Sequence, residues 1–172
     1  MELKRIVEAV LFVSGKPVTL KGLNKKLEGS TGAEIEGAMH ELVAEYNYSD
    51  RALEIVEVSG GYQMRTKTDY KECVKKFVKE KDVELTRSIL EALAIIAYRQ
   101  PVTKREIDTL RGVDSSRAVK QLLERKFIEI AGRNEEVGKP IVFRTTNRFL
   151  EVYGLKCIED LPTIKELETL EK

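Results

Sequence analysis

The stretch IVEAVLFVSGKPVT at residues 6–19 decides the fold, because the chain returns to it as ILEALAIIAYRQPVT at residues 89–103. Each copy predicts an apolar helix, a turn that contains proline, and a short helix that begins at the threonine. The two copies are roughly 85 residues apart, a period too long for a solenoid repeat. The repeat therefore indicates two related small domains in tandem.

Each half of the chain predicts the same order of elements, three helices followed by a β-hairpin. In the first half, apolar residues recur with a helical period up to Tyr46, and the period changes to two from Leu53. Ser59 to Gly61 supply the positive φ angles of a hairpin turn. The expected elements of this half are helices at 3–14, 19–27 and 32–48, strands at 53–58 and 62–66, and a further helix at 68–78.

The second half repeats this order, with several helix starts marked by capping residues. Thr86 or Ser88 is expected to cap the apolar helix that ends at Tyr98. Thr103 and Glu106 form a capping box that opens the next helix, which Gly112 ends. The remaining elements are a third helix capped by Asp114 or Ser115, strands at 127–131 and 141–145, and a short helix at 148–153.

Three helices and a hairpin make a winged helix, which is a helix-turn-helix with a hairpin appended. The predicted fold is mostly α with small β-hairpins, of the α+β class, in two tandem winged-helix domains. We place the domains at 1–80 and 83–157, with the charge-dense segment Lys79–Asp82 as linker. Residues 158–172 are expected to form a tail that is helical or disordered.

Composition and charge exclude several classes of protein. The net charge is +1, and neither half carries the basic excess that marks a dedicated DNA-binding domain. The chain lacks an apolar run of 18 residues, so a membrane span is not expected. Cys73 and Cys157 are isolated, as in reduced cytoplasmic proteins. His40 is the single histidine and phosphate-binding glycine motifs are absent, so we expect no enzyme, metal site or cofactor.

Two uses of a winged helix are open at this point, DNA reading and protein binding. The third helix of the first domain carries glutamates and no lysine or arginine, which disfavours insertion into a DNA groove. The second domain carries more cations at the corresponding place: Arg117 and Lys120 on the third helix, and Arg133 and Lys139 in the hairpin. These side chains either form a solvated face or contact phosphates. The alternative function is therefore a winged-helix DNA-binding transcriptional regulator that uses residues 115–125.

The first helix is apolar on almost every side, and such a helix must be buried on every side. Either the domain core covers it completely, or part of it is a dimer contact. For the second case Val10 and Val13 are the candidates. At the end of the repeated helix, Tyr98, Arg99 and Gln100 offer residue types that are favoured at protein interfaces. The alternative there is a packed turn in which Tyr98 supports the core.

The segments together resemble the ScpB family, the segregation and condensation protein B subunits of prokaryotic condensin. The most specific block is AYRQPVT at residues 97–103, together with the RGV and GKP triplets at 111–113 and 138–140. Nearly the whole chain carries the resemblance: residues 6–15 with Pro17, 53–67, 90–103, Ile107, 111–113, 122–125, 132–133, 138–140, 145–146, 149–150, 154–155 and 160–162.

This resemblance implies a tandem winged-helix protein without catalysis that forms a homodimer, chiefly through its N-terminal domain. The implied partners are the kleisin ScpA and, through it, an SMC ATPase, with DNA contacted indirectly or weakly and no membrane. The implied role is chromosome condensation and segregation in the cell cycle, in the cytoplasm at the nucleoid. From their residue types and expected exposure, the candidate partner-binding residues are Tyr98, Arg99, Gln100, Arg117 and Lys139.

Three positions depart from the family pattern. Asp114 stands where asparagine is expected, Lys139 where arginine is usual, and Arg144 where glycine is common. Aspartate caps a helix as well as asparagine does, and lysine keeps the charge of arginine but lacks its planar fork. Arg144 adds bulk beside the hairpin.

Overall fold

The computed structural model describes residues 2–78, 85–135, 137–163 and 166. The chain divides into two compact units, Met1–Asp82 and Val83–Lys172. The linker expected at residues 79–82 and most of the tail after residue 163 lie outside the described residues. Each unit has its own apolar core, so each is described by itself.

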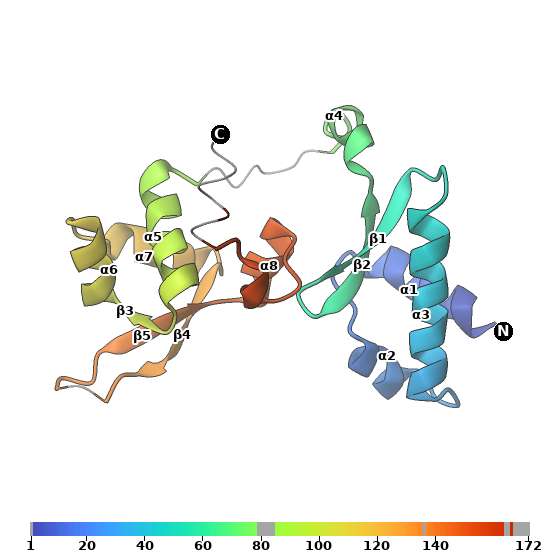
Figure 1. Cartoon of the computed structure of the whole chain (residues 1–172), viewed down its shortest axis with the longest axis horizontal. Helices are drawn as coiled ribbons and strands as arrows, with labels where there is room; N and C mark the ends of the chain where they lie inside the picture. The colour runs from blue at the N-terminus through green and yellow to red at the C-terminus, as the bar shows by residue number, and fades with distance from the viewer. Residues whose placement is uncertain (1, 79–84, 136, 164–165, 167–172) are drawn as a thin grey trace. The chain divides into compact units, whose positions relative to one another are not determined.

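Unit 1 contains the expected three helices and hairpin (Figure 1). The capping box of Thr31 and Glu34 starts its longest helix, because each side chain accepts a hydrogen bond from the backbone of the other. The hairpin closes through Ser59 and Gly60, both at positive φ, as the twist of two paired strands favours. The elements are α1 (Leu3–Ser14), α2 (Leu20–Lys26), α3 (Gly32–Asn47), β1 (Leu53–Val58), β2 (Gly61–Thr66), the 3₁₀ helix η1 (Thr68–Tyr70) and α4 (Lys71–Val74).

The helix predicted at 68–78 is wrong in length. A 3₁₀ turn precedes α4, which has four residues, and only hydrogen-bonded turns continue to Val78. Its side chains explain the difference. Neither η1 nor α4 buries a residue and Phe77 is exposed, so the segment has a helical pattern without a core to pack on.

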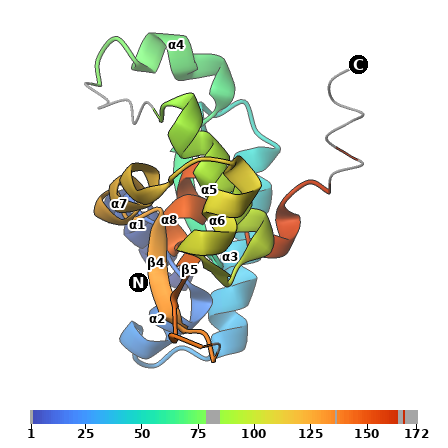
Figure 2. The same cartoon turned by 90° about the vertical axis from the view of Figure 1, so that its left-hand side faces the viewer.

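Unit 2 repeats the arrangement and adds a short strand (Figure 1 and Figure 2). Its sheet has the order β3-β5-β4, so β5 lies in the middle. The β4–β5 hairpin, here called the wing, extends away from the three helices of its own unit in both views. The elements are α5 (Arg87–Arg99), β3 (Val102–Thr103), α6 (Lys104–Arg111), α7 (Ser116–Glu124), β4 (Ile128–Arg133), β5 (Ile141–Thr145), α8 (Asn147–Tyr153) and the 3₁₀ helix η2 (Ile158–Asp160).

The structure explains why the Pro-Val-Thr triplet occurs twice. Val18 exchanges two backbone hydrogen bonds with Tyr62 of β2, at 2.8 and 2.9 Å, and Val102 pairs with Phe143 of β5. The threonine that follows each valine caps the next helix. The triplet therefore ties the start of the second helix to the return strand of the hairpin in both units. The threonine caps are predicted by the sequence, whereas the strand pairing of the valines is not.

The helix starts of unit 2 differ in detail from the predicted caps. Thr86 is at the N-cap of α5 but makes no side-chain capping bond, and the Ser88 hydroxyl instead accepts a hydrogen bond from Arg111. At α7, Ser115 is at the N-cap position, whereas the Asp114 carboxylate accepts from the Ser116 backbone N–H. The capping box of Thr103 at α6 is confirmed.

Candidate protein-interaction surfaces

The end of α1 presents apolar side chains to solvent. Val7 and Leu11 are buried, and Val10 is partly buried against the same core. Phe12 and Val13 are 72% and 80% exposed. Within its unit α1 is therefore covered on one side and open at its C-terminal end. Of the two residues expected at a dimer contact, Val13 lies on the open surface, and Val10 is partly buried against the core.

Polar contacts with α3 fix the direction in which this surface faces. The Tyr46 hydroxyl donates a hydrogen bond to Glu8, the acid that interrupts the apolar run of α1. This bond raises the pKa of Tyr46, because it stabilises the protonated phenol. Lys4 pairs with Glu45 at 2.9 Å and with Glu41 at 3.4 Å. The acidic face of α3 is thus partly neutralised from within the unit.

In unit 2, the C-terminal end of α5 carries the residues Tyr98, Arg99 and Gln100. Arg99 is exposed, as a partner-binding residue must be. Tyr98 is 44% exposed, and its hydroxyl donates to the Pro162 carbonyl at 2.7 Å. Gln100 is partly buried, and its side-chain oxygen accepts from the backbone N–H and the hydroxyl of Thr145 at 2.7 and 2.9 Å. Gln100 therefore fastens the turn to β5.

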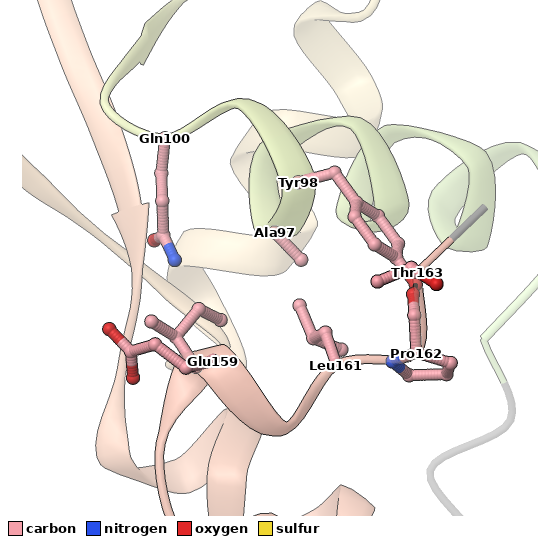
Figure 3. Close-up of a pocket in the computed structure, with 8 residues that line it drawn as sticks. Ala97, Tyr98, Gln100, Glu159, Leu161, Pro162 and Thr163 are labelled. Atoms are coloured by element: carbon pink, nitrogen blue, oxygen red, sulfur yellow. Dashed lines mark hydrogen bonds between the residues drawn. The ribbon is translucent and has the colours of Figure 1, made fainter. Parts of the chain in front are cut away.

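A pocket of about 360 Å³ lies beside this end of α5 (Figure 3). The Tyr98 ring points toward Pro162 and Thr163, and Ala97 and Leu161 line the space next to it. One wall comes from α5 and the other from residues 158–163, here called the clasp. Ile158 and Leu161 of the clasp pack against the core of unit 2, although both lie in the segment that the sequence predicts as a tail. The complete lining is Ala97, Tyr98, Gln100, Ile158, Glu159, Leu161, Pro162 and Thr163.

Arg117 and Lys139 lie on other elements of unit 2. Arg117 is exposed on α7, where Lys120 pairs with Glu124 at 3.9 Å, as the helical spacing predicts. Lys139 is exposed in the wing at a φ of 43°, and its carbonyl accepts from the Arg133 guanidinium at 3.1 Å. These exposed cations belong to two separate elements and do not form a continuous basic face along α7.

Sequence reasoning missed a buried guanidinium between α5, α6 and α7. The Arg111 side chain is 6% exposed and donates to the hydroxyls of Ser88 and Ser115, at 2.8 and 3.0 Å. It also pairs with Glu91 at 3.4 Å, while its Nε has no hydrogen-bond partner among the described residues. The Arg-Gly-Val triplet carries part of the family resemblance, but nothing in the sequence indicates that its arginine is buried.

The residues that the structure describes contain no helix that could cross a membrane. In the same ranges, histidine, cysteine and acidic side chains nowhere gather in the threes that a metal ion would need.

A family model described as segregation and condensation complex subunit ScpB matches residues 5–164. The chain belongs to the ScpB family. Segregation and condensation protein B of Syntrophotalea carbinolica is 42% identical over 172 residues, which are 100% of this chain and 87% of that protein. The resemblance seen in the sequence is confirmed, and with it a family role in chromosome segregation and condensation.

Solved structures of ScpB proteins are also similar to this chain. ScpB from Mycobacterium tuberculosis is 33% identical, and the match covers 90% of this chain and 96% of that chain with a TM-score of 0.42. A dimer of an ScpB N-terminal domain complexed with an ScpA peptide is 30% identical. That match covers 44% of this chain and 93% of that chain, with a TM-score of 0.40. Membership of the ScpB family rests on the sequence matches and not on these superpositions.

The structure accounts for two departures from the ScpB pattern. The Asp114 carboxylate accepts from Lys104 at 2.6 Å and from the Ser116 hydroxyl at 2.8 Å. The hydrogen bond from Lys104 is the main reason that the pKa of Asp114 is lowered. Arg144 pairs across the wing with Glu129 at 2.8 Å. Both charged residues therefore have partners within their own unit.

Proposed function

We propose that this protein is a non-catalytic, homodimeric subunit of a chromosome-condensing SMC complex and that it binds the kleisin ScpA. Membership of the ScpB family over nearly the whole chain is the observation that carries the proposal. In this proposal the kleisin connects the protein to the SMC ATPase, and contact with DNA is indirect or weak. The protein acts in the cytoplasm at the nucleoid during cell division.

Dimerisation is assigned to the N-terminal domain, residues 1–80, through the C-terminal end of α1. Phe12 and Val13 support this assignment, because two adjacent large apolar side chains stand in solvent at the end of an ordered helix. Aromatic residues are favoured at the centres of protein interfaces. Two copies related by a two-fold axis would bury both pairs at one contact.

Kleisin binding is assigned to the C-terminal domain, residues 83–157, around the end of α5. Arg99 is exposed there beside the half-exposed ring of Tyr98, and arginine and tyrosine are the types that carry most binding energy at interfaces. Gln100 acts indirectly in this assignment, because its bond to Thr145 holds the turn. Arg117 and Lys139 contribute peripheral charge, which influences association rate more than affinity.

The test is co-expression of the full chain with the ScpA subunit of its own genome, followed by size exclusion with light scattering at high salt. A complex that contains two copies of this chain is expected. Apolar contacts persist in high salt, whereas binding dominated by phosphate contacts weakens steeply. Failure to form a complex, together with salt-sensitive retention of duplex DNA, would favour a DNA-binding regulator that uses α7.

A further inference from the structure

The pocket between α5 and the clasp has a polar end and an apolar middle (Figure 3). Gln100 and Glu159 stand at the polar end, and the Tyr98 ring closes the opposite end. Ala97 and Leu161 line the space between the two ends. The pocket therefore suits a partner that is apolar where it enters the middle and polar beside it.

Glu159 of the clasp brings a negative charge to the polar end. Its residue is exposed, and its carboxylate accepts a hydrogen bond from the Cys157 thiol, which raises the pKa of that thiol. In the described part of unit 2, the ion pairs leave Glu159 without a lysine or arginine. A carboxylate has roughly four lone-pair sites, so one weak thiol donor leaves it able to pair with a cation.

The C-terminal end of α5 makes the same end of the pocket more negative. The last carbonyls of a helix lack partners within the helix, and they carry the negative end of its dipole. In α5 the Ala97 carbonyl would accept from residue 101, which is proline and has no N–H. Arg99 of the last turn is exposed and does not line the pocket. A cation from a partner is therefore favoured there.

The Gln100 side chain offers a hydrogen-bond donor beside this negative end. Its oxygen accepts from the backbone N–H and the hydroxyl of Thr145 at 2.7 and 2.9 Å, which fixes the orientation of the amide. The amide nitrogen is left on the side of the pocket (Figure 3). An amide nitrogen donates to carbonyl oxygens, and the backbone carbonyls of an extended peptide are free to accept. The donor therefore favours an extended peptide over a helix.

We propose that the pocket binds an extended segment of the kleisin that carries an apolar residue and, two positions away, a lysine or arginine. Side chains two positions apart point to the same side of an extended chain, about 7 Å from each other. The apolar side chain packs on Ala97 and Leu161, and the cation pairs with Glu159. A backbone carbonyl between them accepts from Gln100. This inference rests on the proposed function and names the chemistry by which the end of α5 recognises the kleisin.

The test is a charge reversal in the full chain, with ScpA binding measured by calorimetry. Glu159→Lys is expected to weaken binding about tenfold, because repulsion replaces attraction at the partner's cation. Glu159→Gln removes only the charge and should give an intermediate affinity. Both variants change an exposed side chain and should keep the thermal unfolding midpoint of the parent. The matched control is Glu124→Lys, which makes the same change of charge at an exposed position of α7 and should leave affinity unchanged.

A second set of variants identifies the residue of the partner. Each lysine or arginine of ScpA that lies two positions from an apolar residue is changed to glutamate. One of these changes is expected to restore binding to the Glu159→Lys chain, because it recreates the ion pair with its charges exchanged.

The outcomes separate this inference from the proposed function. ScpA binding that is unchanged in Glu159→Lys, or that no ScpA variant restores, would overturn the inference and leave the proposed function standing. A parent chain that does not bind ScpA would overturn both. A Glu159→Lys chain that binds ScpA normally but no longer dimerises would overturn the inference too, because a second copy would then occupy the pocket.

Discussion

Phe12→Ala is expected to weaken the homodimer without unfolding the protein. Full burial of a phenylalanine side chain contributes about 1.5–3 kcal/mol, and Phe12 has 72% of its surface left to bury. A two-fold dimer buries this side chain twice, so the substitution removes about 2–4 kcal/mol of association free energy. The dimer dissociation constant should therefore rise by roughly 30-fold to 1,000-fold. Sedimentation equilibrium over a range of protein concentrations measures this constant directly.

The matched control is Tyr48→Ala in the same unit. Tyr48 is 92% exposed and lies at the end of α3, away from the surface assigned to the dimer. The control should leave the dissociation constant unchanged, and both variants should keep the thermal unfolding midpoint of the parent. An unchanged dissociation constant for folded Phe12→Ala would refute the assignment of the α1 end to the dimer contact.

Three further predictions concern unit 2. Arg99→Ala should weaken ScpA binding about tenfold in calorimetry with no change in unfolding, because an exposed interface arginine contributes to binding alone. Arg111→Ala should lower the free energy of unfolding, measured by urea denaturation, by about 2 kcal/mol, because it removes buried hydrogen bonds and packing. The control Arg105→Ala, at an exposed position of the same helix, should change it by less than about 0.5 kcal/mol. Hydrogen bonds from the Thr103 backbone and hydroxyl lower the pKa of Glu106 in the folded protein. The stability that the ionised carboxylate contributes to the fold is therefore complete above the unfolded pKa of about 4.3, and it is lost as the pH falls through the lower folded pKa. Glu106→Gln should accordingly flatten the dependence of unfolding free energy on pH in that acidic range, and an unaltered slope would contradict the assignment.

The sequence predicted those parts of the fold that depend on local signals. The capping boxes that begin at Thr31 and Thr103 predict helix starts, because the side chains that accept hydrogen bonds from the first backbone N–H groups lie only three residues away. The change of period at Leu53 and the turn at Gly60 likewise define a hairpin from neighbouring residues. The pairing of Val18 with Tyr62 is between segments 44 residues apart, and no local pattern encodes it.

The interaction surfaces were predicted less completely, for a related reason. The sequence shows that α1 is apolar on almost every side, but it does not show which side packs against α3. The structure does, and it leaves Val13 exposed while Val10 is partly buried against the core. At the end of α5, the residue types gave no indication that Gln100 would bond to Thr145 of β5. The sequence predicts an exposed Arg111, because arginine is rarely buried unless partners from other helices surround it. In the structure Glu91 of α5 is such a partner.

The division of the contacts between two self-contained cores has a consequence for synthesis of the chain. All elements of unit 1 precede residue 82, and its hairpin closes through a two-residue turn at Ser59 and Gly60. Contacts between residues near in sequence form early, because the entropic cost of loop closure grows with loop length. The N-terminal half can therefore complete its own core while the ribosome is still making the C-terminal half. A nascent chain that folds in this order leaves Phe12 and Val13 exposed at the end of α1, and under the proposed homodimer a second nascent or finished copy would contact the chain there.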